Sequence, residues 1–108
     1  MGSDGLPSPF AEEVLDLVAQ IPVGRAMSYG DVARAVGSGG PRQVGQTMAR
    51  FGSGVPWWRV VRADGTPAPQ VALEALRRLR SEGAPLKPAG DRVDWRTARW
   101  TPNPQPCL

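Results

Sequence analysis

Side chains that could carry nucleophilic or acid–base catalysis are almost absent from this sequence. It has no histidine, which is the commonest general base, and its only cysteine is Cys107, next to the last residue. A reactive thiolate needs a neighbouring base or another setting that lowers its pKa, and a proline-rich terminus supplies neither. A single cysteine also cannot form an intrachain disulfide or a cysteine-based metal site. We therefore expect no Ser–His or Cys–His catalytic pair, no metal and no cofactor.

The arginine residues are concentrated in the middle of the chain. Residues 1–23 contain four acids and no base, whereas residues 24–62 contain six arginines and a single acid, Asp31. A concentrated run of arginine is the electrostatic footprint expected of phosphate binding. A GC-rich genome would explain the preference for arginine over lysine, but not the scarcity of acids in this segment.

The length of 108 residues corresponds to one domain, and the 12 prolines and 13 glycines predict short elements joined by many turns. No apolar run approaches the roughly 18–20 residues of a transmembrane helix, and the N-terminus lacks the pattern of a signal peptide. We expect a cytoplasmic monomer that does not bind membranes. Its folded domain should cover residues 8–100, between a flexible leader at 1–7 and a disordered tail at 101–108.

Helical periodicity and capping residues predict the elements of the first half. Apolar residues recur with helical spacing from Phe10 to Ile21, and Ser8 or Pro9 stands near the start. Ser28 is a predicted N-cap with Asp31 in the capping-box position, which gives a short helix ending near residue 36. A glycine-rich turn at 37–40 leads to a third helix at about 41–51, with Pro41 in its first position.

The two faces of the third predicted helix differ sharply. One face is apolar and should pack in the core; it contains Val44, Met48 and Phe51. The opposite face is small or able to form hydrogen bonds; it contains Arg42, Gly45, Gln46 and Ala49. Two short helices joined by a glycine-rich turn, the second with a slim polar face, are typical of a helix-turn-helix. An ordinary amphipathic helix with a small solvent face is the alternative.

The second half should contain a strand, a helix and a closing element. Residues 58–62 are the best strand candidate, with a turn at 63–65. Residues 71–81 return to helical spacing, and we expect Leu73, Leu76 and Leu79, with Ala72 and Ala75, to face inward. Residues 91–100 form a short element whose Trp95 and Trp100 should cover the core.

Several blocks of the sequence, taken in order, resemble the DNA-binding domain of O6-alkylguanine-DNA alkyltransferases. The resemblance covers roughly residues 20–83 and implies a mainly α, winged-helix-like domain with a helix-turn-helix and a short β-hairpin or strand. The blocks are Ile21-Pro22-Val23-Gly24, Ser28-Tyr29-Gly30-Asp31-Val32-Ala33, Pro41-Arg42-Gln43-Val44-Gly45-Gln46-Thr47-Met48, Val55-Pro56-Trp57-Trp58-Arg59-Val60-Val61, Asp64-Gly65 and Leu79-Arg80-Ser81-Glu82-Gly83.

The departure from that family is as informative as the match. The alkyltransferases carry Pro-Cys-His-Arg, in which the cysteine accepts the alkyl group and a histidine held by a glutamate activates it; here the two positions are Trp57 and Trp58. An indole can neither form a thiolate nor deprotonate one, so alkyl transfer should be absent. Tryptophan at the cysteine position marks the alkyltransferase-like proteins. The resemblance to them implies non-enzymatic binding of O6-alkylguanine in double-stranded DNA, and delivery of the lesion to nucleotide excision repair proteins.

The resemblance also implies roles for individual residues. Arg42 would intercalate where the base has left the stack, and Tyr29 would help to rotate the nucleotide. The slim helix face would lie in the minor groove, where small side chains allow close approach. The predicted DNA-binding and flipping residues are Tyr29, Arg42, Gly45, Gln46, Ala49 and Ser28. The predicted lesion-pocket residues are Trp57, Val55, Pro56, Val60, Val71 and Tyr29.

Two further residues of the motif, and one residue outside it, are expected to act structurally. Trp58 should fill the core, Arg59 should brace the strand through backbone carbonyls, and Glu82 should have a structural role because it has no imidazole to orient. The loop at 66–71 closes the pocket in the family, yet here it contains no cation and no aromatic residue. The alternative function is therefore a general winged-helix DNA-binding module without lesion specificity.

Overall fold

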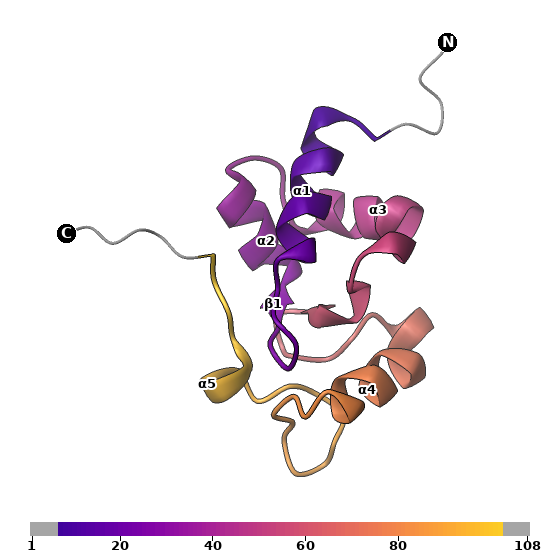
Figure 1. Ribbon diagram of the computed structural model, residues 1–108, viewed down its shortest axis with the longest axis vertical. Coiled ribbons are helices and arrows are strands. Elements are labelled where there is room, and N and C mark those ends of the chain that lie inside the picture. The colour runs from indigo at the N-terminus through magenta and orange to yellow at the C-terminus, as the bar shows by residue number, and fades with distance from the viewer. Residues whose placement is uncertain (1–6, 103–108) are drawn as a thin grey trace, which may run out of the picture.

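The computed structural model describes residues 7–102, and most of the predicted leader and tail, with Cys107, lies outside the described residues. The chain is mostly helical with one small sheet, which confirms the predicted fold class (Figure 1). Single turns of 3₁₀-helix occupy Gly52–Gly54, Trp57–Arg59 and Pro69–Val71. The helices and strands are α1 (Pro9–Ala19), β1 (Met27–Ser28), α2 (Tyr29–Val36), α3 (Pro41–Phe51), β2 (Val60–Val61), α4 (Ala72–Ser81) and α5 (Trp95–Ala98).

The first three helices begin where local capping rules place them. Ser8 caps α1 by accepting a hydrogen bond from the Ala11 N–H at 3.1 Å. Ser28 and Asp31 form the predicted capping box, in which the Ser28 hydroxyl accepts from the Asp31 N–H at 3.0 Å. Pro41 stands at the first position of α3, where its missing N–H removes no helical bond.

Two adjoining clusters make up the core. Helices α1, α2 and α3 gather at one end of the molecule and bury the first cluster, which includes Ile21, Val32 and Val44 (Figure 1). Helices α4 and α5 lie at the other end, and Leu79 and Val93 belong to the second cluster. Trp95 packs against the second cluster and Trp100 against the first, as expected of residues that cover the core. Within residues 7–102, no helix is long and apolar enough to cross a membrane.

The sheet joins the two ends and has only two residues in each strand. Strands β1 and β2 run parallel, with Met27 opposite Val60 and Ser28 opposite Val61. The short strand was predicted, but its partner is the segment before α2, so the sheet is not a hairpin. The predicted strand start at Trp58 is also wrong, because Trp57–Arg59 turns as a 3₁₀-helix before the extended backbone begins.

The prediction for the inward face of α4 is confirmed for Ala75 and Leu79 and is wrong for Leu73. Leu73 is 87% exposed, whereas Ala75 and Leu79 are buried in the second cluster. Ala75 and Leu79 are four residues apart and share one face, while Leu73 is two residues before Ala75 and so points to roughly the opposite side. Burial of a small alanine allows α4 to pack closely against the 3₁₀ turn at Trp57–Arg59, and this packing selects the face.

Candidate functional site

A cavity of about 920 Å³ opens between α3, the end of β2 and the loop before α4. Its lining comes from segments that are far apart in the sequence. Seven of the residues predicted to bind DNA or the lesion line it: Tyr29, Arg42, Gly45, Gln46, Ala49, Trp57 and Val71. The fold thus brings the slim face of α3 together with the aromatic motif and the loop.

Tyr29, predicted to help rotate the nucleotide, and Arg42, predicted to intercalate, lie at helix starts beside this cavity. Tyr29 is the first residue of α2, and Arg42 lies in the first turn of α3. Burial raises the pKa of the Tyr29 hydroxyl, an effect that the charge of Arg62 partly opposes, so the phenol stays protonated and can donate a hydrogen bond at neutral pH. Arg42 is exposed and forms no ion pair with any residue from 7 to 102.

The face of α3 beside the cavity has room in front of it. A Cβ atom added at Gly45 would meet nothing within 4 Å beyond the adjoining backbone of its own helix, and Gln46 and Ala49 are exposed. Gly45 is therefore not required by packing inside the protein. Its small size instead leaves space for something outside to approach the helix.

Trp57 forms one wall of the cavity and is fixed by its neighbours. Its ring meets that of Trp58 edge to face, with centroids 5.6 Å apart and planes at 88°. The guanidinium of Arg78 lies 5.7 Å from the Trp57 ring centroid and 4.6 Å from that of Trp58. Such edge-to-face and cation–π contacts orient the indole rings, so the wall is preformed.

Four predicted site residues do not line this cavity. Val55 and Pro56 line a second cavity of about 440 Å³, which shares Trp57 with the first. Val60 is 3% exposed because its side chain enters the core among the first three helices. Ser28 is buried as well, since its hydroxyl is used to cap α2. The 3₁₀ turn at Trp57–Arg59 changes the direction of the chain between Pro56 and Val60, so their side chains lie in different places.

Arg62 lines the cavity, although the sequence interpretation assigned it no role there. The loop at 66–71 supplies no cation, as its sequence indicates, and the cation at this side of the cavity comes instead from the end of β2. Strand alternation could not have found it, because both residues of β2, Val60 and Val61, are buried. Within the described residues, no cluster of potential metal ligands is present.

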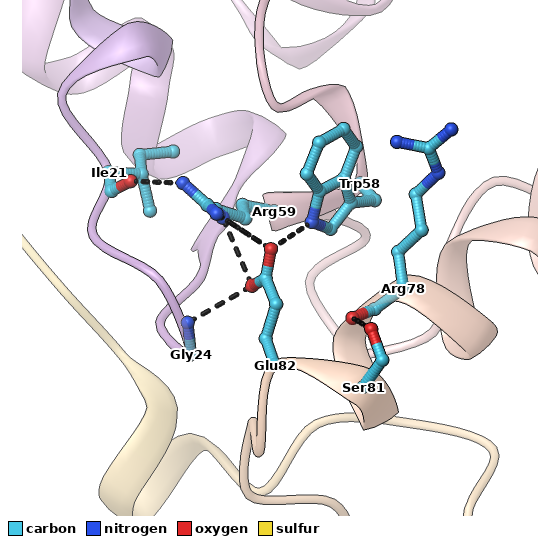
Figure 2. Close-up of polar contacts among 7 residues, drawn as sticks. All are labelled: Ile21, Gly24, Trp58, Arg59, Arg78, Ser81 and Glu82. Carbon is cyan, nitrogen blue, oxygen red and sulfur yellow. Dashed lines mark hydrogen bonds and ion pairs between the residues drawn. The ribbon is translucent and has the colours of Figure 1, made fainter.

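Glu82 connects the tryptophan motif to the rest of the protein (Figure 2). Its carboxylate accepts hydrogen bonds from the Trp58 Nε1–H at 2.7 Å and from the Gly24 N–H at 3.0 Å, and it pairs with Arg59 at 2.6 Å. Arg59 also donates to the Ile21 carbonyl at 2.8 Å, which confirms its predicted bracing role. Trp58 packs against the second core cluster as expected, but its bond to Glu82 was not predicted.

Replacing Trp58 with phenylalanine should reduce the free energy of unfolding by about 1.5 kcal/mol, because a hydrogen bond to a charged group is lost while an aromatic ring remains. Urea denaturation followed by circular dichroism measures the change. Trp95→Phe is the matched control, since it removes an indole bond of 3.0 Å to the neutral Ala63 carbonyl. An equal decrease in the free energy of unfolding in the two variants would show that the bond to Glu82 contributes no more than a bond to a neutral carbonyl.

Comparison with known proteins identifies the family. Residues 9–84 match the family model described as 6-O-methylguanine DNA methyltransferase, DNA binding domain. A DNA base-flipping protein from Escherichia coli is 37% identical over 97 residues, which cover 84% of this chain and 74% of that protein. Alkyltransferase-like protein 1 from Schizosaccharomyces pombe is 43% identical over 60 residues, which cover 53% of this chain and 56% of that protein.

The fold agrees with these relatives. A crystal structure of S. pombe Atl1 in complex with damaged DNA containing O6-carboxymethylguanine superposes with a TM-score of 0.74 at 31% identity, over 86% of this chain and 95% of that chain. The chain belongs to the family of the 6-O-methylguanine DNA methyltransferase DNA-binding domain, as an alkyltransferase-like member.

Proposed function

We propose that this protein recognises O6-alkylguanine in duplex DNA by holding the nucleotide outside the helix, without removing the alkyl group. The observation that carries the proposal is the meeting of Tyr29, Arg42 and Trp57, from three separate segments, around one cavity of about 920 Å³ beside the slim face of α3. The relative named as a base-flipping protein and the neighbour bound to damaged DNA support this assignment.

The arrangement suggests how the nucleotide would be held. The open face around Gly45 lets α3 lie close to the minor groove, and Arg42 at the leading end of the helix fills the gap in the base stack. Extrusion of a base costs a few kcal/mol, which contacts in the cavity must offset. Trp57 supplies an apolar wall for the alkyl group, and the Tyr29 hydroxyl donates to the base or its phosphate.

The site should hold the lesion without chemistry. Trp57 stands where a nucleophile would be needed, and its neighbour Trp58 uses its only polar atom to donate to Glu82. Neither residue can supply or activate a thiolate. We propose that the protein binds as a monomer and presents the lesion to nucleotide excision repair proteins.

Mass spectrometry tests the absence of chemistry. After incubation with a duplex containing O6-methylguanine, the recovered DNA should keep its methyl group and the protein its mass. An increase of one methyl group in the mass of the protein would show that it is an alkyl acceptor.

A general DNA-binding module is the second candidate, because Arg42 and Arg62 at the cavity would attract the phosphates of any duplex. Under that function, affinity would be independent of the lesion and would fall steeply with salt. Lesion recognition instead requires a preference that persists at each salt concentration.

Gly45→Leu separates folding from DNA binding. Its side chain meets open space in the protein, and replacement of a helical glycine stabilises a helix by about 0.5–1 kcal/mol, so the melting temperature should not fall. The same side chain should obstruct the minor-groove approach and weaken binding of both damaged and undamaged duplex by about tenfold or more.

Ala35→Leu, on an exposed position of α2 away from the cavity, is the matched control and should leave binding unchanged. Fluorescence anisotropy and thermal melting measure the two effects. Unchanged DNA affinity in Gly45→Leu would contradict the placement of α3 in the groove.

A further inference from the structure

Arg62 lines the cavity and carries a positive charge, but it has no role in the binding steps proposed above. It follows β2 directly, and its backbone is held by a tight turn, in which the Arg62 N–H donates to the Thr66 carbonyl and the Gly65 N–H donates to the Arg62 carbonyl, each at 2.8 Å. Gly65 has a positive φ of 90°, and a side chain there would come within 2.9 Å of the Val93 carbonyl. The base of the Arg62 side chain is therefore fixed next to the cavity.

The charge of Arg62 is available to a ligand. The nearby acid, Asp64, accepts hydrogen bonds from the Thr66 N–H at 2.9 Å and from the Thr66 hydroxyl at 2.6 Å, and it acts on Arg62 only through space, without an ion pair. These two hydrogen bonds, with a smaller contribution from the charge of Arg62, hold the pKa of Asp64 below its usual range. In the described part of the chain, Arg62 forms no ion pair.

Arg62 is exposed at the cavity wall, and its charge acts on another residue of that wall, Tyr29. Its charge lowers the pKa of the Tyr29 hydroxyl and so opposes the effect of burial, which places the guanidinium within electrostatic reach of that group. Tyr29, Trp57 and Arg62 line the same cavity. Because Trp57 supplies an apolar wall, a ligand that reaches past it toward Arg62 would meet a cation without a protein partner.

We propose that Arg62 makes this protein prefer O6-alkyl groups that carry a carboxylate, such as carboxymethyl, over neutral groups of the same size. The inference rests on the proposed function and names the class of lesion that its cavity favours. A guanidinium binds a carboxylate through two parallel N–H···O bonds, which are stronger than bonds between neutral groups. A neutral alkyl group would leave Arg62 in water, without gain and without penalty.

Four duplexes of one sequence test the inference, with guanine, O6-methylguanine, O6-carboxymethylguanine or O6-carbamoylmethylguanine at the same position. The last two differ by a charge and have nearly the same shape. The wild-type protein should bind the carboxymethyl duplex about tenfold more tightly than the carbamoylmethyl duplex. Arg62→Ala should bring this ratio to about one, and Arg62→Lys should retain part of it because the charge remains.

Arg50→Ala is the matched control. It removes the same charge from an exposed arginine that does not line the cavity, so it should weaken binding to all four duplexes by one common factor and keep the ratio. The inference is overturned by a wild-type ratio near one, or by a ratio that survives in Arg62→Ala. A uniform loss over the four duplexes in Arg62→Ala also overturns it, since Arg62 would then contact phosphate. Equal wild-type affinity for guanine and O6-methylguanine instead overturns the proposed function.

Discussion

Replacement of Glu82 by alanine should lower the free energy of unfolding by about 3 kcal/mol, a large effect for a single change. The Glu82 and Arg59 side chains are each only 12% exposed, so loss of the carboxylate leaves the Arg59 guanidinium with the Ile21 carbonyl as its remaining partner. The Trp58 and Gly24 N–H groups lose their acceptor at the same time. Urea denaturation followed by circular dichroism gives the value.

Glu74→Ala is the control for this change. Glu74 lies on α4, close in sequence to Glu82, and pairs with Arg77 and Arg78, but these pairs are open to solvent. Exposed ion pairs contribute little to stability, so this variant should melt close to the wild type. If the two alanine variants are equally stable, the connection made by Glu82 does not hold the fold together.

The same carboxylate should make stability depend on pH. Burial alone would raise the pKa of Glu82. The hydrogen bonds from Arg59, Gly24 and Trp58 together lower the pKa by more than burial raises it, so the pKa lies below its usual value. A proton therefore binds more readily to the unfolded chain. The stabilisation is complete above the unfolded pKa of about 4.3 and is lost as the pH falls through the folded pKa. The stability difference between wild type and Glu82→Gln should narrow below about pH 4, and a difference that stays constant from pH 7 to pH 3 would contradict this.

Replacement of Arg42 by alanine should reduce the preference for O6-methylguanine over guanine by about tenfold, which corresponds to about 1.4 kcal/mol. Arg42 is exposed in the first turn of α3 and lines the cavity, so its removal should not disturb the fold. In the proposed mechanism its side chain refills the base stack, which stabilises only the complex in which a base has been extruded. Fluorescence anisotropy with matched duplexes measures the preference.

Arg50→Ala again supplies the control, because it removes one charge from the other end of the same helix. It should weaken binding to damaged and undamaged DNA by the same factor, as expected for the loss of a phosphate attraction. An undiminished lesion preference in Arg42→Ala would show that Arg42 contributes only its charge.

The helix starts were predictable because each depends on residues within one turn of the chain. Ser8 with Ala11 and Ser28 with Asp31 satisfy N–H groups that any helix leaves open, so local sequence was sufficient. The exposure of Leu73 on α4 was not predictable in this way. Leucine at 73 fits an apolar stripe, but its exposure is decided by a sheet and a closing segment that are remote in sequence.

The candidate site was also predictable only in part. The slim face of α3 could be read from helical spacing, and the meeting of Tyr29, Arg42 and Trp57 followed from a family resemblance rather than from periodicity. The place of Arg62 in the cavity depends on the parallel pairing of β1 with β2, which no local pattern indicates. The bond from Trp58 to Glu82 likewise joins separate segments, so the family resemblance could suggest a structural role for Glu82 but not its partner.

Competition binding tests the central claim most directly. A duplex with a single O6-methylguanine competes against the identical undamaged duplex for the wild-type protein over a range of salt concentrations. The proposed function predicts that the damaged duplex is preferred at every concentration, while both affinities fall with salt in parallel because the phosphate contacts are shared. Equal affinity for the two duplexes at every salt concentration would show a general DNA-binding protein and contradict lesion recognition.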